Sequence, residues 1–88
     1  MAHRLTEQEH DTVLLLAKIL SKQLPTQYRS VSGGIASGLV RLRKNPLAAS
    51  DVASVLERYD ADETALATLV EIGVLEAVPE GYALHVPR

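Results

Sequence analysis

Four carboxylates lie close together in the second half of the chain, at Glu57, Asp60, Asp62 and Glu63. Paired carboxylates are the groups that general acid–base catalysis uses, so this run is the first candidate for an active site. An acid–base pair also needs a pocket, and no histidine lies near this run in the sequence. Capping of helix N-termini and a solvated surface explain the same residues more simply. We therefore expect an acidic surface without catalytic residues, and no enzyme.

Two histidines and a glutamate near the start of the chain, His3, Glu7 and His10, have the spacing of metal ligands. Offsets of four and three residues place side chains on one helix face, and both imidazole and carboxylate bind zinc. His3, however, precedes Thr6, the expected helix cap, and a frayed end does not hold a ligand in place. The chain contains no cysteine, which excludes disulfides and thiolate zinc sites. We expect no metal and no other cofactor.

The glycine-rich stretch SVSGGIASG, residues 30–38, raises the question of phosphate binding. Backbone amides at a glycine-rich helix start can hold an anion. The Gly-Lys-Ser/Thr end of a P-loop is absent, and Ser37 lies in no Gly-x-Ser-x-Gly elbow. Turn and capping chemistry explain the first half of the stretch without a ligand. A neighbouring helix that approaches closely would explain Gly38.

Charge divides the chain into two unlike halves. Residues 1–50 carry seven Lys/Arg and three Asp/Glu, whereas residues 51–81 carry one Arg and eight Asp/Glu. Such an asymmetry indicates that the halves meet different partners, or each other. The cations Arg29, Arg41, Arg43 and Lys44 are candidate phosphate contacts. The alternative is that they satisfy the dipole and the last carbonyls of a helix C-terminus.

Length and composition limit the fold to one small domain over residues 1–88. The chain has three Tyr and no Phe or Trp, so its core must consist of Leu, Val, Ile and Ala. The longest purely apolar run, Val13 to Ala17, is too short to span a bilayer, and the acidic residues before it do not match a signal peptide. We expect a cytoplasmic protein with no membrane contact.

The elements that position these residues follow from apolar periodicity and from turn residues. Thr6 to Glu9 matches a capping box, and a helix from there should run to about Leu24, before Pro25. A loop is expected over 25–34, and Leu66, Leu69 and Val70 are expected to face inward from a helix at 62–72. Three further helices are expected, at 35–44, 51–59 and 62–72. Asn45-Pro46 should end the first of these, Ser50 should cap the second, and the third should begin with an Asp60/Glu63 capping box and end at Gly73. Two strands should follow at 74–78 and 82–86, joined through Pro79-Glu80-Gly81.

The first predicted helix, residues 6–24, has more apolar surface than one small core needs. One face consists of Val13, Leu16, Leu20 and Leu24, and the residues in excess of it are Leu14, Leu15 and Ile19. Since burying a leucine stabilises by about 1.5–3 kcal/mol, a few such residues in each subunit make a useful interface. The sequence therefore predicts a homodimer through Leu14, Leu15 and Ile19.

Five segments follow one another in a recognisable order from residue 33 to residue 87. They are GGIASGLVRLRKNP, SDVASVL, RYDADE, TALATLVEIGVLE and AVPEGYALHV. They resemble, in turn, the leading helix, the first helix of the pair, the turn, the second helix and the wing hairpin of the winged helix-turn-helix superfamily. The expected fold class is therefore mainly α with a C-terminal β-hairpin, a winged helix-turn-helix with an extra N-terminal helix.

The resemblance implies a small DNA-binding regulatory protein that acts as a homodimer on double-stranded DNA. In that superfamily the second helix of the pair enters the major groove, so Thr64 and Thr68 would contact bases. The four cations would contact phosphates. The residues argue against this use, because the outward positions of 62–72 include Glu63 and Glu71 and no Lys or Arg. Carboxylates oppose the phosphate neutralisation that supplies most of the affinity of such domains.

A protein-interaction winged helix is the alternative that the charges favour. In this hypothesis the acidic half, residues 51–81, docks on a basic protein partner or imitates the charge of nucleic acid. Both hypotheses remain open from the sequence. The acidic partner face would comprise Glu57, Asp60, Asp62, Glu63 and Glu71.

Overall fold

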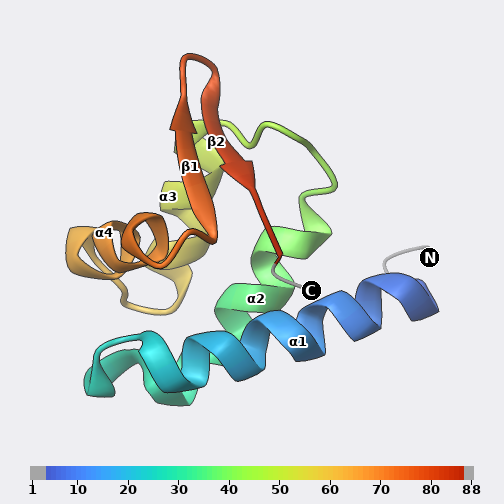
Figure 1. Cartoon of the computed structure of the whole chain (residues 1–88), viewed down its shortest axis with the longest axis horizontal. Coiled ribbons are helices and arrows are strands. Elements are labelled where there is room, and N and C mark those ends of the chain that lie inside the picture. The colour runs from blue at the N-terminus through green and yellow to red at the C-terminus, as the bar shows by residue number, and fades with distance from the viewer. Residues whose placement is uncertain (1–3, 87–88) are drawn as a thin grey trace.

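A computed structural model describes residues 4–86 of the chain. The described part is mainly helical and ends in an antiparallel hairpin, as the sequence predicts, with α1 lying along α2 and the hairpin standing over α3 (Figure 1). The elements are α1 (Glu7–Gln23), the 3-10 helix η1 (Thr26–Val31), α2 (Ser32–Arg41), α3 (Ala49–Arg58), α4 (Glu63–Glu71), β1 (Leu75–Val78) and β2 (Gly81–Leu84).

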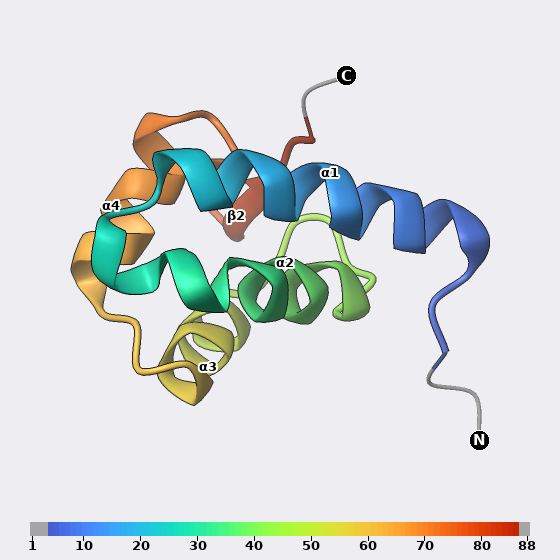
Figure 2. The ribbon, with the colours of Figure 1, turned by 90° about the horizontal axis from the view of Figure 1, so that it is seen from below.

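Helix α1 begins with the predicted capping box. The Thr6 hydroxyl accepts a hydrogen bond from the Glu9 amide at 3.1 Å, and Glu9 Oε1 accepts one from the Thr6 amide at 2.9 Å. One face of the helix then buries Val13, Leu16 and Leu20 against the core. Figure 2 shows α1 and α2 side by side, so this face of α1 packs against α2.

The prediction of a loop over residues 25–34 is wrong. The chain forms η1 and then enters α2 at Ser32, three residues before the expected start at Ile35. Two local hydrogen bonds hold this segment in helical form, from Arg29 Nε to the Leu24 carbonyl and from the Ser32 hydroxyl to the Arg29 carbonyl. The glycines that suggested a loop, Gly33 and Gly34, lie inside α2, and packing requires a small residue only at Gly34.

Helix α2 ends at Arg41, before the expected end at Lys44, because the chain turns at Arg43, whose φ is 50°. The connection to α3 then pairs with the hairpin. The Leu47 amide donates to the Tyr82 carbonyl at 2.6 Å, and the Tyr82 amide donates to the Leu47 carbonyl at 2.8 Å. Leu47 therefore extends the two-stranded sheet across β2.

The caps of α3 and α4 differ from those expected. Helix α3 begins two residues earlier, at Ala49, so Ala48 is its N-cap and Ser50 lies in its first turn. Helix α4 is capped by Asp62 and not by Asp60, because Asp62 Oδ1 accepts the Thr64 amide at 2.9 Å.

The inward face of α4 also differs in part from the expected one. Ala65 and Leu69 are fully buried and Leu66 is half-buried, whereas Val70, expected to face inward, is 38% exposed. The helix is therefore turned so that Ala65 takes the central core position. Val70 lies next to Leu69 in sequence and is carried to the edge of the core.

The hairpin is shorter than expected and turns in two residues. Val78 pairs with Gly81, which leaves Pro79 and Glu80 as the turn. Gly73 ends α4 with φ of 85°, as predicted. Gly81 has φ of 144°, and a Cβ there would overlap the Leu47 carbonyl oxygen. A glycine at 81 is thus required by the pairing of Leu47 with Tyr82.

Helices α2 and α3 pack closely because α2 presents glycines to its neighbour. A Cβ on Gly34 would lie 2.5 Å from Cε1 of Tyr59, and one on Gly38 would lie 2.7 Å from Cγ1 of Val55. These separations are too short for carbon atoms, so the expected role of Gly38 in close helix approach is confirmed.

In the part of the chain from 4 to 86, no helix is long and apolar enough to cross a membrane.

Gly38→Ala should destabilise the fold by about 1–2 kcal/mol, because the overpacking cost exceeds the helix-propensity gain. Gly33→Ala is the matched control, since it places a methyl group where no atom lies within 4 Å, and it should be neutral or stabilising by roughly 0.5 kcal/mol. Urea unfolding measures both. Combining Gly38→Ala with Val55→Ala should show favourable coupling. Equal stabilities of the two alanine variants would contradict this packing.

Candidate nucleic-acid and protein interfaces

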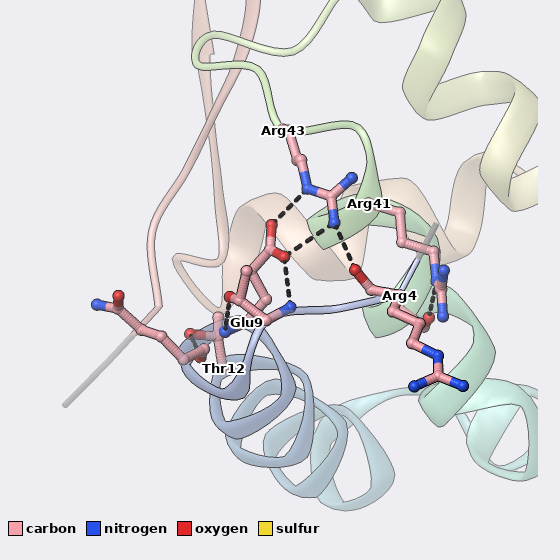
Figure 3. Close-up of polar contacts among 8 residues, drawn as sticks. Arg4, Glu9, Thr12, Arg41 and Arg43 are labelled. Atoms are coloured by element: carbon pink, nitrogen blue, oxygen red, sulfur yellow. Dashed lines mark hydrogen bonds and ion pairs between the residues drawn. The ribbon is translucent and has the colours of Figure 1, made fainter. Parts of the chain in front are cut away.

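Arg43, a predicted phosphate contact, is held by the N-terminal end of α1. Its Nε donates to Glu9 Oε2 at 2.6 Å and its Nη2 donates to Glu9 Oε1 at 2.9 Å, the bidentate geometry of a strong arginine–carboxylate pair. Nη2 also donates to the Arg4 carbonyl at 3.1 Å. Figure 3 shows the guanidinium lying between Glu9 and the backbone of Arg4. The pair joins two segments 34 residues apart.

The same contacts move the pKa values of both partners. The hydrogen bonds from Arg43 and then from the Thr6 amide lower the pKa of Glu9 to about 2. The hydrogen bond to Glu9 raises the pKa of Arg43 above its usual value. Glu9 is therefore ionised in the folded protein at neutral pH. A phosphate would have to compete with this carboxylate for Arg43.

The other three predicted cations also contact groups of their own chain. Arg29 Nε donates to the Leu24 carbonyl at 3.0 Å, which satisfies the C-terminus of α1. Arg41 Nε donates to the Ser37 hydroxyl at 2.9 Å, and Lys44 Nζ lies 3.7 Å from Asp51 Oδ2. Arg41, Arg43 and Lys44 gather at the end of α2, whereas Arg29 lies on η1, which precedes α2. The expected alternative, cations that satisfy helix-end carbonyls, holds for Arg29.

Helix α4, the predicted reading helix, exposes carboxylates and small neutral residues. Glu63, Thr64 and Glu71 are exposed, while Thr68 is half-buried and its hydroxyl donates to the Thr64 carbonyl at 3.0 Å. Figures 1 and 2 both place α4 at one end of the molecule and the connection after α2 toward the other. The threonines and the main cation group therefore do not form one surface.

Asp62 is fixed in place at the turn between α3 and α4. Its Oδ1 accepts the hydroxyl of Tyr28 at 2.8 Å and the amide of Thr64 at 2.9 Å. The Tyr28 bond first, and the Thr64 amide second, lower the pKa of Asp62 below its usual value. Tyr28 is buried, so this bond fastens the start of α4 to η1.

The structure gathers three of the five predicted acidic residues around one groove of about 240 Å³ between α3 and α4. Glu57, Asp62 and Glu63 line it. Asp60 occupies the turn with φ of 55°, and Glu71 lies at the far end of α4. The apolar lining of this groove was not predicted from the sequence, although helical spacing of small and branched residues is a usable signal for it. That lining consists of Ala53, Leu56, Ala61 and Leu66.

The three residues predicted for a dimer interface are exposed to different degrees. Leu14 is 56% and Leu15 38% exposed, whereas Ile19 is half-buried against the core. Leu15 also lines an open groove of about 390 Å³ between α1 and the end of the hairpin, with Leu84 and Val86. The exposed apolar surface of α1 is thus smaller than the sequence indicated, because Ile19 contributes to the core of its own chain.

The histidine-based metal candidate lies partly outside the described residues. His3 is not described, and Glu7 and His10 are both exposed on α1. Within residues 4–86 no group of three or more His, Asp or Glu side chains is arranged to hold a metal ion. Comparison with known proteins finds no match to a family model, to a curated protein or to a solved structure.

Replacing Glu9 by Gln should lower the stability near neutral pH, because it removes the ion pair with Arg43. The pKa of Glu9 is depressed in the folded state, so its contribution is complete above the unfolded value of 4.5 and disappears as the pH falls toward about 2. The difference in unfolding free energy between wild type and variant should therefore shrink over that range. Urea unfolding at several pH values measures it.

Glu7→Gln is the control for this series, since it removes a carboxylate from the same first turn of α1 without touching the pair with Arg43. It should cost less near neutral pH. If both variants lose the same stability, or if the difference between wild type and Glu9→Gln grows with acid, the ion pair does not stabilise the fold.

Proposed function

We propose that this chain is a winged-helix protein that acts through protein contacts, with its acidic half docking on a basic partner. One observation carries the proposal. The surface formed by α4 and the turn before it exposes the carboxylates of Asp60, Glu63 and Glu71, and α4 contains no Lys or Arg. Such a surface attracts a cationic partner and repels phosphate.

The order and pairing of the elements support the winged-helix part of the proposal. Helix α2 is followed by α3 and α4, which a short turn at residues 59–62 separates, and then by a hairpin with a two-residue turn. Leu47, between α2 and α3, pairs with Tyr82 of β2 and so attaches the hairpin to the start of the helix pair. This is the order of parts on which the resemblance to winged helices rests.

DNA binding is the second candidate, because Arg41 and Lys44 are exposed near the end of α2. A duplex contacted there would not lie on α4, whose N-terminal end carries Asp62 and Glu63. The helix dipole that attracts anions to such an end is already matched by these carboxylates. Helix α4, which would read bases, lies at one end of the molecule, and the cations after α2, which would bind phosphates, lie toward the other (Figures 1 and 2). The protein partner is therefore the better supported candidate.

We also propose a homodimer through the exposed leucines of α1. Leu14 and Leu15 are adjacent in the sequence. Leu15 also lines the groove between α1 and the end of the hairpin, together with Leu84 and Val86. Each leucine buried from water contributes about 1.5–3 kcal/mol, so two copies of this patch supply a useful interface term. The acidic surfaces of two subunits would then give a basic partner two contacts.

A fluorescein-labelled, capped hexa-arginine peptide and a labelled duplex of mixed sequence separate the two candidates by anisotropy at low salt. The peptide should bind, and added salt should weaken the binding. Glu63→Gln with Glu71→Gln should weaken it by about three- to tenfold, because two exposed charge contacts are lost. Glu7→Gln with Asp11→Asn, which removes the same charge from α1, should have a smaller effect.

Stronger binding of the duplex than of the peptide would overturn the protein-partner proposal. In that case Arg41→Ala with Lys44→Ala should weaken duplex binding and flatten its salt dependence. Arg43 is left intact in this test, because its pairing with Glu9 belongs to the fold.

Leu14→Glu with Leu15→Glu should convert the dimer to monomers without unfolding it, since both side chains are exposed in the single chain. Sedimentation equilibrium gives the mass and circular dichroism the helix content. Arg58→Glu, which changes the charge by the same amount at an exposed position of α3, is the control and should remain dimeric. A wild type that stays monomeric at high concentration would show that no such interface exists.

A further inference from the structure

The groove between α3 and α4 combines an apolar floor with an acidic rim. Leu56 is buried and Leu66 half-buried at its floor, where Ala53 and Ala61 complete the apolar lining. Glu57 and Glu63 are exposed at its edge, one on each helix. The groove is therefore more than a group of carboxylates, because its floor offers apolar surface to an occupant.

Helical spacing and the turn between the helices build this arrangement. Leu56 and Glu57 follow Ala53 at three and four residues, so α3 presents all three on one face. The Ala61 amide donates to the Leu56 carbonyl at 2.9 Å, which closes the end of α3 and directs the chain into α4. This backbone hydrogen bond thus fixes the turn at one end of the groove.

Asp62 gives the rim a fixed point. Both of its hydrogen bonds, from Tyr28 and from the Thr64 amide, end on Oδ1 and come from neutral donors, so its charge is not cancelled by a cation. Within residues 4–86, Glu57 and Glu63 form no ion pair. Two full charges at the start of α4 also outweigh the partial positive charge of about half a unit that a helix N-terminus carries.

We propose that this groove binds the side chain of an arginine or lysine in an extended basic segment of a partner protein. The methylene stem of such a residue lies on the floor at Leu56 and Leu66, and its charged end reaches the carboxylates of Glu57 and Glu63. Arginine and lysine are the side chains that combine an apolar stem with a cationic end. The inference rests on the proposed function, because it names the place where the basic partner is recognised.

Other occupants fit the groove less well. A wholly apolar ligand would strip water from the rim carboxylates without pairing them, which is costly. A phosphate would be repelled by three acidic side chains. A metal ion would need several oxygens turned toward one point, and the described residues hold no such group.

Ala53→Leu tests the groove without changing any charge. Ala53 is exposed on α3, and leucine is a good helix former, so the variant fills the groove while the fold is kept. Ala77→Leu, the same substitution at an exposed position of β1 outside the groove, is the control. The probe is the capped hexa-arginine peptide, followed by anisotropy and by chemical-shift changes in an ¹⁵N–¹H spectrum.

Ala53→Leu should weaken peptide binding about fivefold or more, whereas Ala77→Leu should leave it unchanged. One surface contact, made by the methylene stem and the charged end of a single side chain, contributes about this factor to the affinity. Shift changes in the wild type should centre on Ala53, Glu57, Ala61 and Glu63. Wild-type binding that Ala53→Leu leaves intact, with Glu63→Gln and Glu71→Gln still effective, would overturn the groove and keep the acidic surface. No binding of the peptide to the wild type would overturn the proposed function itself.

Discussion

The close approach of α2 and α3 is the constraint on which the rest of the structure depends. With no Phe or Trp, the chain fills its core with aliphatic side chains, and its elements must come near one another to leave no voids. Gly34 and Gly38 remove the side chains that would keep the helices apart, so Tyr59 and Val55 lie almost on the α2 backbone. The position of α3 then sets where the turn, α4 and the groove between them lie.

The features that the sequence predicted correctly are local ones. The capping box at Thr6 and Glu9, the end of α4 at Gly73 and the hairpin each depend on residues only a few positions apart. The features it did not predict join distant segments. Neither Arg43 with Glu9 nor Tyr28 with Asp62 leaves a pattern in the sequence, because each pair is 34 residues apart and any of several partners would suit each side chain. The apolar floor of the groove was missed for the same reason, since it appears only when α3 and α4 are placed together.

The division of charge along the chain becomes a division of roles in the fold. Arg29 and Arg43 hold segments of the protein together, one at the end of α1 and the other at its start. Among the carboxylates of the second half, Asp62 caps α4, Asp51 lies near Lys44 and Glu76 contacts His85. Arg43 is offset by Glu9, whereas Glu57 and Glu63 form no ion pair in the described part of the chain, so the uncompensated acid lies beside the groove between α3 and α4. The charges of the sequence favoured a protein partner for this reason, whereas DNA binding was implied by the resemblance to winged helices.

The pairing of Leu47 with Tyr82 has a consequence for how this sequence can diverge. A side chain at residue 81 would collide with the Leu47 carbonyl, whereas Pro79 and Glu80 are exposed in the turn. Descendants of this chain can therefore change the tip of the hairpin freely but must keep glycine at its base, just as they must keep small residues at 34 and 38. Distant relatives would share these few glycines at fixed separations long after the rest of the sequence had ceased to be recognisable.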